Sequence, residues 1–399
     1  MHTKRDRTAR FRTAAASLLH GPGRRRPPAP LLLAAASVSA FMAVPVIYIF
    51  IRALSGDAST WRQVLGGRLP SLMWSTGWLA VIVTSASSVT GAVLAFLVVR
   101  TDLPGRRFFR WLLALPLVFP PYVGALTYII IFGPRGWLRG LIGWTPLPVY
   151  ESLFSTSLVL TLFCYPYVYL IVMASLRSLS ASYEETALAC GLSYPKVLYR
   201  VVLPMMRPAV GAGALLVALY VFSDFGAVAM LRYNTFVSSI YYQIQGRFDR
   251  TGAAILSSVL ILIALALLWL EGRSRKGRSF SRTETGRRVG GDIALGRLRL
   301  PALCFASAVF SLSVLAPVAV LTYWSVLGIG AGALGGRFWG YTINSVILAA
   351  AVSLFCIFSA LPVVYLKSRF PSLLSRLISG VSFAGIALPG VIPLSPCFC

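Results

Sequence analysis

Long apolar runs are the feature that most constrains this chain. Runs of about 20 residues recur near residues 31–51, 75–99, 111–132, 153–176, 209–230, 253–270, 301–327, 344–366 and 377–396. A helix of about 20 residues crosses the ~30 Å hydrocarbon core of a bilayer. Only 12% of the residues are charged and 57% are hydrophobic, which excludes the surface of a water-soluble globule. The sequence therefore predicts an all-α, polytopic membrane protein with about nine transmembrane helices.

The positive charges predict how these helices are oriented. The formal net charge is +26, yet the Lys and Arg residues lie between the apolar runs, which favours membrane loops over nucleic-acid binding. The segments 1–29 and 272–299 are especially basic. With a cytoplasmic N-terminus, most of the 37 Lys and Arg fall in cytoplasmic segments, as the positive-inside rule requires. We expect a multi-pass inner-membrane protein with a cytoplasmic tail at 1–29 and lipid as its surroundings.

Short matches in a fixed order predict an internal repeat. Leu65–Arg68 reads LGGR and recurs at Leu334–Arg337. The matches predict one copy at residues 30–271, with six spans, and a second at 300–399, with three, joined by the basic linker. The second copy is incomplete, which favours a truncated or frameshifted reading frame over a functional short form.

Catalytic motifs are not found in the sequence. A Gly-rich loop followed by Gly-Lys-Ser/Thr is missing, so ATP binding by this chain is not expected. The six cysteines and two histidines show no metal-ligand spacing. We therefore predict that the chain is not an enzyme and holds neither a metal nor another cofactor.

A polar island at residues 182–208, SYEETALACGLSYPKVLYRVVLPMMRP, interrupts the apolar runs. Ser182 with Glu185 three residues later is a capping box at a helix start. Gly191 stands where a helix would end in a left-handed cap. A second helix is predicted shortly after it, ending at Pro204.

This island resembles the EAA loop of the membrane subunits of binding-protein-dependent ABC importers. The family pattern reads here as Glu185-Thr186-Ala187, Gly191, Val201 and Leu203-Pro204, with Thr186 in place of an alanine. The resemblance implies a type I ABC importer permease fold and a cytoplasmic contact with an ABC ATPase subunit. The residues it implicates in this contact are Glu184 and Glu185 as charged contacts, Ala187 and Gly191 for close approach, and Leu203 and Pro204 for the return to the membrane. An ordinary helical hairpin and a soluble helix-turn-helix are the alternatives.

Residues 223–271 resemble, more narrowly, the permeases of iron(III) importers. This resemblance rests on an acid-Phe-Gly run that is followed by Tyr-Asx-Thr-Phe. The resemblance implies a permease subunit that works with ATPase subunits and with a periplasmic or lipoprotein solute-binding protein in a bacterial plasma membrane. Thiamine or phosphonate permeases are close alternatives. A secondary transporter, a channel or a non-functional truncated remnant also stays open.

Polar and helix-breaking residues within the spans indicate a translocation pathway. Asp224 is an acid within a predicted span. One interpretation is that it lines a cavity or gate of the pathway, and the alternative is that it forms an ion pair with Arg232. Pro120, Pro121 and Pro166 are expected to break or kink their helices, with ordinary kinks as the alternative.

The loop at residues 233–250 is predicted to lie outside the membrane. It carries the polar residues Gln245, Arg247, Asp249 and Arg250, which we expect to dock a solute-binding protein. A merely solvated loop is the alternative.

Overall fold

The computed structural model describes residues 27–143, 147–179, 181–246, 249–275, 293–332 and 335–384. Nearly all residues in these ranges are helical. The sole strand-like feature within them is an isolated parallel bridge between Thr101 and Ile293. The prediction of an all-α protein is confirmed.

Seven helical segments of the described chain are long and apolar enough to cross a membrane. Their bounds are α2 (Ala29–Leu54), α3 (Ala58–Gln63) with η1 (Val64–Arg68) and α4 (Leu69–Arg100), α8 (Leu153–Ser178), η3 (Leu198–Val202) with α11 (Leu203–Ser223), α14 (Arg250–Arg275), η4 (Gly296–Leu298) with α15 (Arg299–Phe310), η5 (Ser311–Leu315) and α16 (Ala316–Gly330), and α17 (Gly336–Arg369). The multi-pass prediction holds.

The count of about nine spans is approximate. A bent pair of helical segments, Arg106–Val118 and Pro121–Ile142, meets at 93° and forms either an eighth span or a re-entrant loop. It comprises α5 (Arg106–Leu112), η2 (Leu115–Val118), α6 (Pro121–Phe132) and α7 (Trp137–Ile142). The ninth span, predicted at 377–396, overlaps the shorter helix α18 (Leu373–Ala384), and its remaining residues lie outside the described ranges.

The prolines predicted to distort helices act differently from one another. Pro120 caps α6 and Pro121 is its first residue, so these two prolines start a helix at the sharp bend. Pro166 lies inside α8, which continues through it for 26 residues. The predicted break is therefore present at Pro120 and Pro121, whereas Pro166 leaves its helix continuous.

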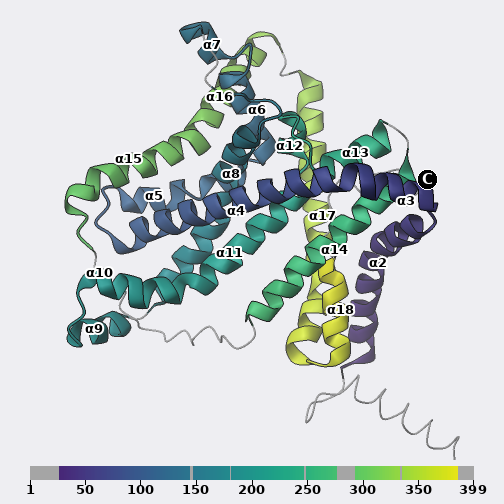
Figure 1. Cartoon of the computed structure of the whole chain (residues 1–399), viewed down its shortest axis with the longest axis horizontal. Coiled ribbons are helices and arrows are strands. Elements are labelled where there is room, and N and C mark those ends of the chain that lie inside the picture. Colours follow the sequence, from purple (N-terminus) through teal and green to yellow (C-terminus); the bar gives the residue numbers. More distant parts are fainter. Residues whose placement is uncertain are drawn as a thin grey trace, which may run out of the picture. The chain divides into compact units, whose positions relative to one another are not determined.

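Helices α4, α8 and α11 pack side by side and form the core of the larger compact unit (Figure 1). Glycines allow the close approach. A Cβ added at Gly91 on α4 would lie 2.8 Å from the backbone of Tyr165 and Tyr169, and one added at Gly213 on α11 would lie 2.7 Å from the Cα of Val168. Small residues at such crossings let helix backbones approach in membranes, where packing drives association.

The helices group into two compact units that differ from the predicted repeats. One unit contains α2, α17 and α18, and the Ser39 hydroxyl on α2 donates to the Ile378 carbonyl on α18 at 3.2 Å. The other contains α3 to α15 and part of α16, and the Tyr128 hydroxyl on α6 donates to the Leu312 carbonyl at 3.4 Å. The first helix of each predicted repeat therefore packs on helices of the other repeat.

Candidate functional site

Two short helices form a hairpin between α8 and α11, at one end of the larger unit (Figure 1). The first, α9 (Ala181–Ala189), is followed by Gly191 in the left-handed region at φ +82°. The Gly191 amide donates to the Leu188 carbonyl at 2.9 Å, and the Leu192 amide donates to the Ala187 carbonyl at 3.2 Å. This pair of bonds is a Schellman cap, so the left-handed cap predicted at Gly191 is present.

The second helix of the hairpin differs from the prediction. Helix α10 (Tyr194–Val197) continues through the π-helical turn η3 into α11, so Pro204 does not end it. The Leu203 amide donates to the Leu198 carbonyl five residues back, which widens the turn just before Pro204. A wide turn relieves the clash between a proline ring and the preceding turn, and the first turn of a helix tolerates the missing amide.

The start of α9 also differs, because the helix includes Ala181 and Ser182 lies inside its first turn. Most of the hairpin surface is exposed. Tyr199 is 70% exposed and Tyr183 48% exposed. The residues implicated by the resemblance divide by burial: Glu185, Gly191 and Leu203 are exposed, Ala187 and Pro204 are half-buried and Glu184 is buried. Exposed aromatic side chains are typical of a protein-binding surface.

Glu184 points into the protein and pairs with a buried arginine. Its carboxylate forms an ion pair with the guanidinium of Arg100, the last residue of α4. The Arg100 side chain is 1% exposed and the Glu184 side chain 7% exposed. The charge of Glu184 is thus directed at Arg100, and its contact with an ATPase stays a prediction. Sequence reasoning missed Arg100, since no local pattern links residues 84 positions apart.

The Arg100 backbone contacts the chain that follows the basic linker. The Ile293 amide donates to the Arg100 carbonyl at 2.9 Å, and the Asp102 amide donates to the Ile293 carbonyl at 3.2 Å. The Leu295 amide donates to the Asp102 carboxylate at 2.8 Å. Two backbone bonds and one side-chain bond thus attach this segment to the end of α4.

Asp224 caps a helix. It follows α11, and its carboxylate accepts hydrogen bonds from the amides of Ala227 at 3.1 Å and Val228 at 3.4 Å in α12 (Gly226–Met230). The Tyr220 hydroxyl donates to it at 3.4 Å. The expected ion pair with Arg232 is wrong, because that guanidinium lies over the Tyr150 ring instead. Backbone donors thus stabilise the buried acid at a break between two helices.

Comparison with known proteins agrees with this architecture. Residues 87–276 match the sequence profile of the family described as "Binding-protein-dependent transport system inner membrane component". These residues are an ABC importer permease domain. The match includes the hairpin, the ion pair and the Asp224 cap.

Individual relatives extend the similarity. The Fe(3+)-transport system permease protein FbpB 2 of Haemophilus influenzae is 29% identical over 375 residues, covering 92% of this chain and 71% of that protein. The sulfate transport system permease protein CysW of Escherichia coli K12 is 29% identical over 241 residues, covering 59% of this chain and 83% of CysW. The permease is thus a transport component and not an enzyme, as predicted.

The fold also has a solved counterpart. A chain in the crystal structure of a bacterial alginate ABC transporter, in complex with an alginate-bound periplasmic protein, superposes with a TM-score of 0.51 at 13% identity. The match covers 59% of the permease and 88% of that chain. The predicted ABC importer permease fold is confirmed.

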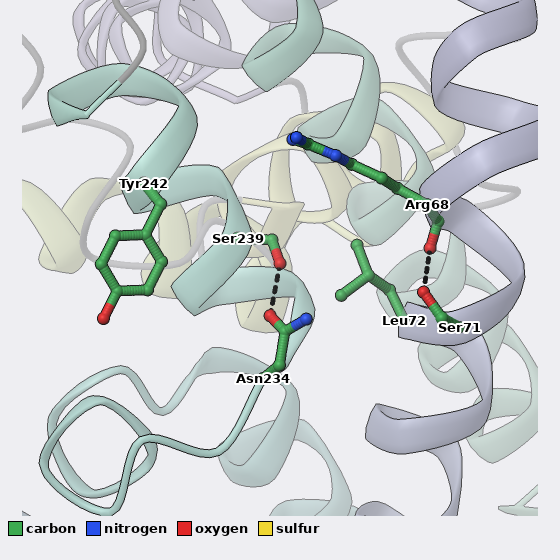
Figure 2. Close-up of a pocket in the computed structure, with 6 residues that line it drawn as sticks. All are labelled: Arg68, Ser71, Leu72, Asn234, Ser239 and Tyr242. Carbon is green, nitrogen blue, oxygen red and sulfur yellow. Dashed lines mark hydrogen bonds between the residues drawn. The ribbon is translucent and has the colours of Figure 1, made fainter. Parts of the chain in front are cut away.

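A polar pocket of about 260 Å³ lies between the start of α4 and α13 (Phe236–Gln245), as Figure 2 shows. Its lining residues are Arg68, Ser71, Leu72, Asn234, Ser239 and Tyr242. The Ser239 hydroxyl donates to the Asn234 amide oxygen at 2.7 Å, and the Ser71 hydroxyl donates to the Arg68 carbonyl at 2.8 Å. Sequence reasoning used Arg68 only as part of a repeat and did not connect it with Asn234, which is distant in sequence.

The residues predicted to dock a solute-binding protein lie at the turn between α13 and α14, where the Asp249 amide donates to the Gln243 carbonyl at 3.0 Å. Gln245 is exposed at the end of α13, and Arg250 is exposed at the first turn of α14. Asp249 accepts a hydrogen bond from the Gly252 amide at 2.8 Å, so its carboxylate caps α14. Arg247 lies outside the described residues.

Proposed function

We propose that the permease couples ATP hydrolysis by partner ATPase subunits to import, with the α9–α10 hairpin as the surface on which an ATPase docks. The observation that carries the proposal is an exposed, capped helical hairpin at the position of the EAA loop pattern. Glu185, Tyr183 and Tyr199 supply exposed acidic and aromatic contacts, and Ala187 and Gly191 supply small residues for close approach. An ATPase that closes on ATP would pull the hairpin and reopen the spans to the outside.

The orientation needed for this contact follows from charge. The basic segments 1–29 and 272–299 belong in the cytoplasm by the positive-inside rule, which places the N-terminus and the hairpin there as well. The start of α4 and α13 then lie on the outer side, with the Arg68 pocket between them. We propose this outer side, including Gln245 and Arg250, as the docking face for a solute-binding protein.

Iron(III) is the substrate that the observations favour. The similarity to FbpB 2 extends over 92% of the chain. Sulfate is the second candidate, because sulfate permeases such as CysW are equally identical, although over 59% of the chain.

Replacing Gly191 with Arg tests the coupling role. Gly191 has no neighbour within 4 Å of an added Cβ, so the side chain enlarges the hairpin surface without a clash inside the chain. Gly143→Arg is a matched control, since Gly143 is also left-handed at φ +75°, also follows a helix and also has open space. Both changes cost about 1–2 kcal/mol of backbone strain.

We expect Gly191→Arg to insert into the membrane normally, but to lose both co-purification with the ATPase and ATP-dependent uptake of radioactive iron(III). Gly143→Arg should keep both. Normal uptake by the Gly191→Arg variant would contradict the coupling role. Loss of membrane insertion in both variants would show that backbone strain, and not the hairpin surface, decides the result.

A further inference from the structure

Helix α9 contacts the rest of the protein through a buried ion pair. Glu184 is the only buried residue among the α9 side chains that the structure describes, whereas Tyr183, Glu185, Thr186, Leu188 and Ala189 are exposed and Ala187 is half-buried. A helix whose apolar residues face outward has little apolar contact to hold it in place. The ion pair of Glu184 with Arg100 is therefore a contact that ties α9 to the end of α4.

Arg100 provides a rigid partner for this contact. It ends α4, which packs against α8 and α11 in the core, and its guanidinium is shielded from solvent. The removal of one partner of a buried ion pair leaves an uncompensated buried charge. The pair thus links α9 directly to a membrane-spanning helix of the core.

The same residue holds a third segment. The Arg100 carbonyl accepts from the Ile293 amide, so the chain leaving the basic linker is fixed to the end of α4 beside the ion pair. Arg100 therefore joins α4, α9 and the start of the segment that leads to α15.

We propose that the Arg100–Glu184 pair is the joint through which displacement of α9 moves α4. Both are positioning residues, since they pair with each other and act through α9 and α4. The inference rests on the proposed coupling function and adds the mechanical connection inside the permease. Exposed Glu185, its neighbour, belongs instead to the surface that meets the ATPase.

The test measures movement of α4 separately from ATP hydrolysis. The full-length permease is reconstituted with its ATPase in proteoliposomes, in a cysteine-free background with an environment-sensitive fluorophore on Trp74→Cys. Trp74 lies on α4 and is 70% exposed. The variants are Glu184→Gln, the apolar double Arg100→Met with Glu184→Leu, and Asp57→Asn as a control at an exposed acid that precedes α3.

We expect Glu184→Gln to keep ATPase binding and hydrolysis while the ATP-induced fluorescence change falls by about fivefold or more. Asp57→Asn should behave as the unmodified protein. The apolar double variant should recover the thermal stability of the fold, because two uncharged partners can pack, but not the fluorescence change.

Two results would contradict the proposed role of the Arg100–Glu184 pair. One is a normal fluorescence change in Glu184→Gln. The other is recovery of stability and fluorescence change together in the double variant, which would make the pair a packing contact only. If the unmodified permease does not bind the ATPase at all, the proposed coupling function fails, and this inference fails with it.

Discussion

Single glycines determine how closely the core helices approach. Backbone atoms of α8 lie within 2.8 Å of the positions that Cβ atoms would take at Gly91 and Gly213, and backbone cannot move aside as a flexible side chain can. Overfilling such a contact forces the helices apart. The sequence shows these glycines within apolar spans, but their spacing alone does not reveal which helix they face.

Gly91→Val should therefore destabilise the permease. We expect a loss of about 1–3 kcal/mol, because the branched side chain must displace the α8 backbone near Tyr165 and Tyr169. Gly77→Val on the same helix is the control, since an added Cβ there meets nothing within 4 Å. Thermal unfolding in detergent provides the measurement, and equal melting temperatures for the two variants would show that the crossing is looser than described.

Asp224 gives a second prediction at this scale. Asp224→Asn keeps an oxygen that accepts from the Ala227 and Val228 amides, so folding and transport should be close to normal. Asp224→Ala removes the cap and should lower stability by about 1 kcal/mol. The two variants are compared by thermal unfolding and by ATP-dependent uptake. A loss of uptake in Asp224→Asn with unchanged stability would favour the pathway role over the cap.

At the scale of elements, local patterns predicted most of what is observed. Apolar runs located the spans, Pro120 and Pro121 located the break before α6, and Gly191 located the end of α9. These features depend on neighbouring residues only. Pro204 was misread, because its effect depends on the wide π-helical turn before it and not on the proline alone.

The hairpin could be located from the sequence, but its attachment could not. Glu184 and Glu185 are adjacent acids in the sequence, yet one is buried against Arg100 and the other is exposed. Which acid turns inward depends on where α4 ends, and that is a property of the packed helices. The Asp224 cap was likewise hidden, because the short helix α12 that it caps lies within the apolar run at residues 209–230, which was predicted as one span.

At the scale of the whole molecule, each compact unit draws helices from both predicted repeats. Helix α2 packs with α17 and α18, whereas α15 belongs with α4, α6 and α8. The repeat matches predict similar helices in both halves, but matches in the sequence cannot tell which copy a helix packs against. Only the three-dimensional structure shows that helices of one repeat pack with helices of the other, an arrangement we call the exchanged packing.

This exchange predicts that a break in the linker leaves the two pieces together. Residues 1–285 and 286–399, expressed as separate chains, should co-purify in mild detergent, because each piece supplies helices to both units. Removal of residues 27–56 from the first piece eliminates α2 and should lower the recovery of the second piece. Separation of the two intact pieces in the same detergent would contradict the exchanged packing.

The placement of α2 has a consequence for biosynthesis. As the first described helix to leave the ribosome, it enters the membrane long before α17 and α18 are made. At ~5–20 residues per second, the delay is on the order of tens of seconds. Lipid tails solvate its apolar surface during that time, so insertion does not depend on a partner. Helix α2 therefore lacks its packing partners in the nascent permease, and the unit that it forms with α17 and α18 can assemble only after most of the chain has been translated.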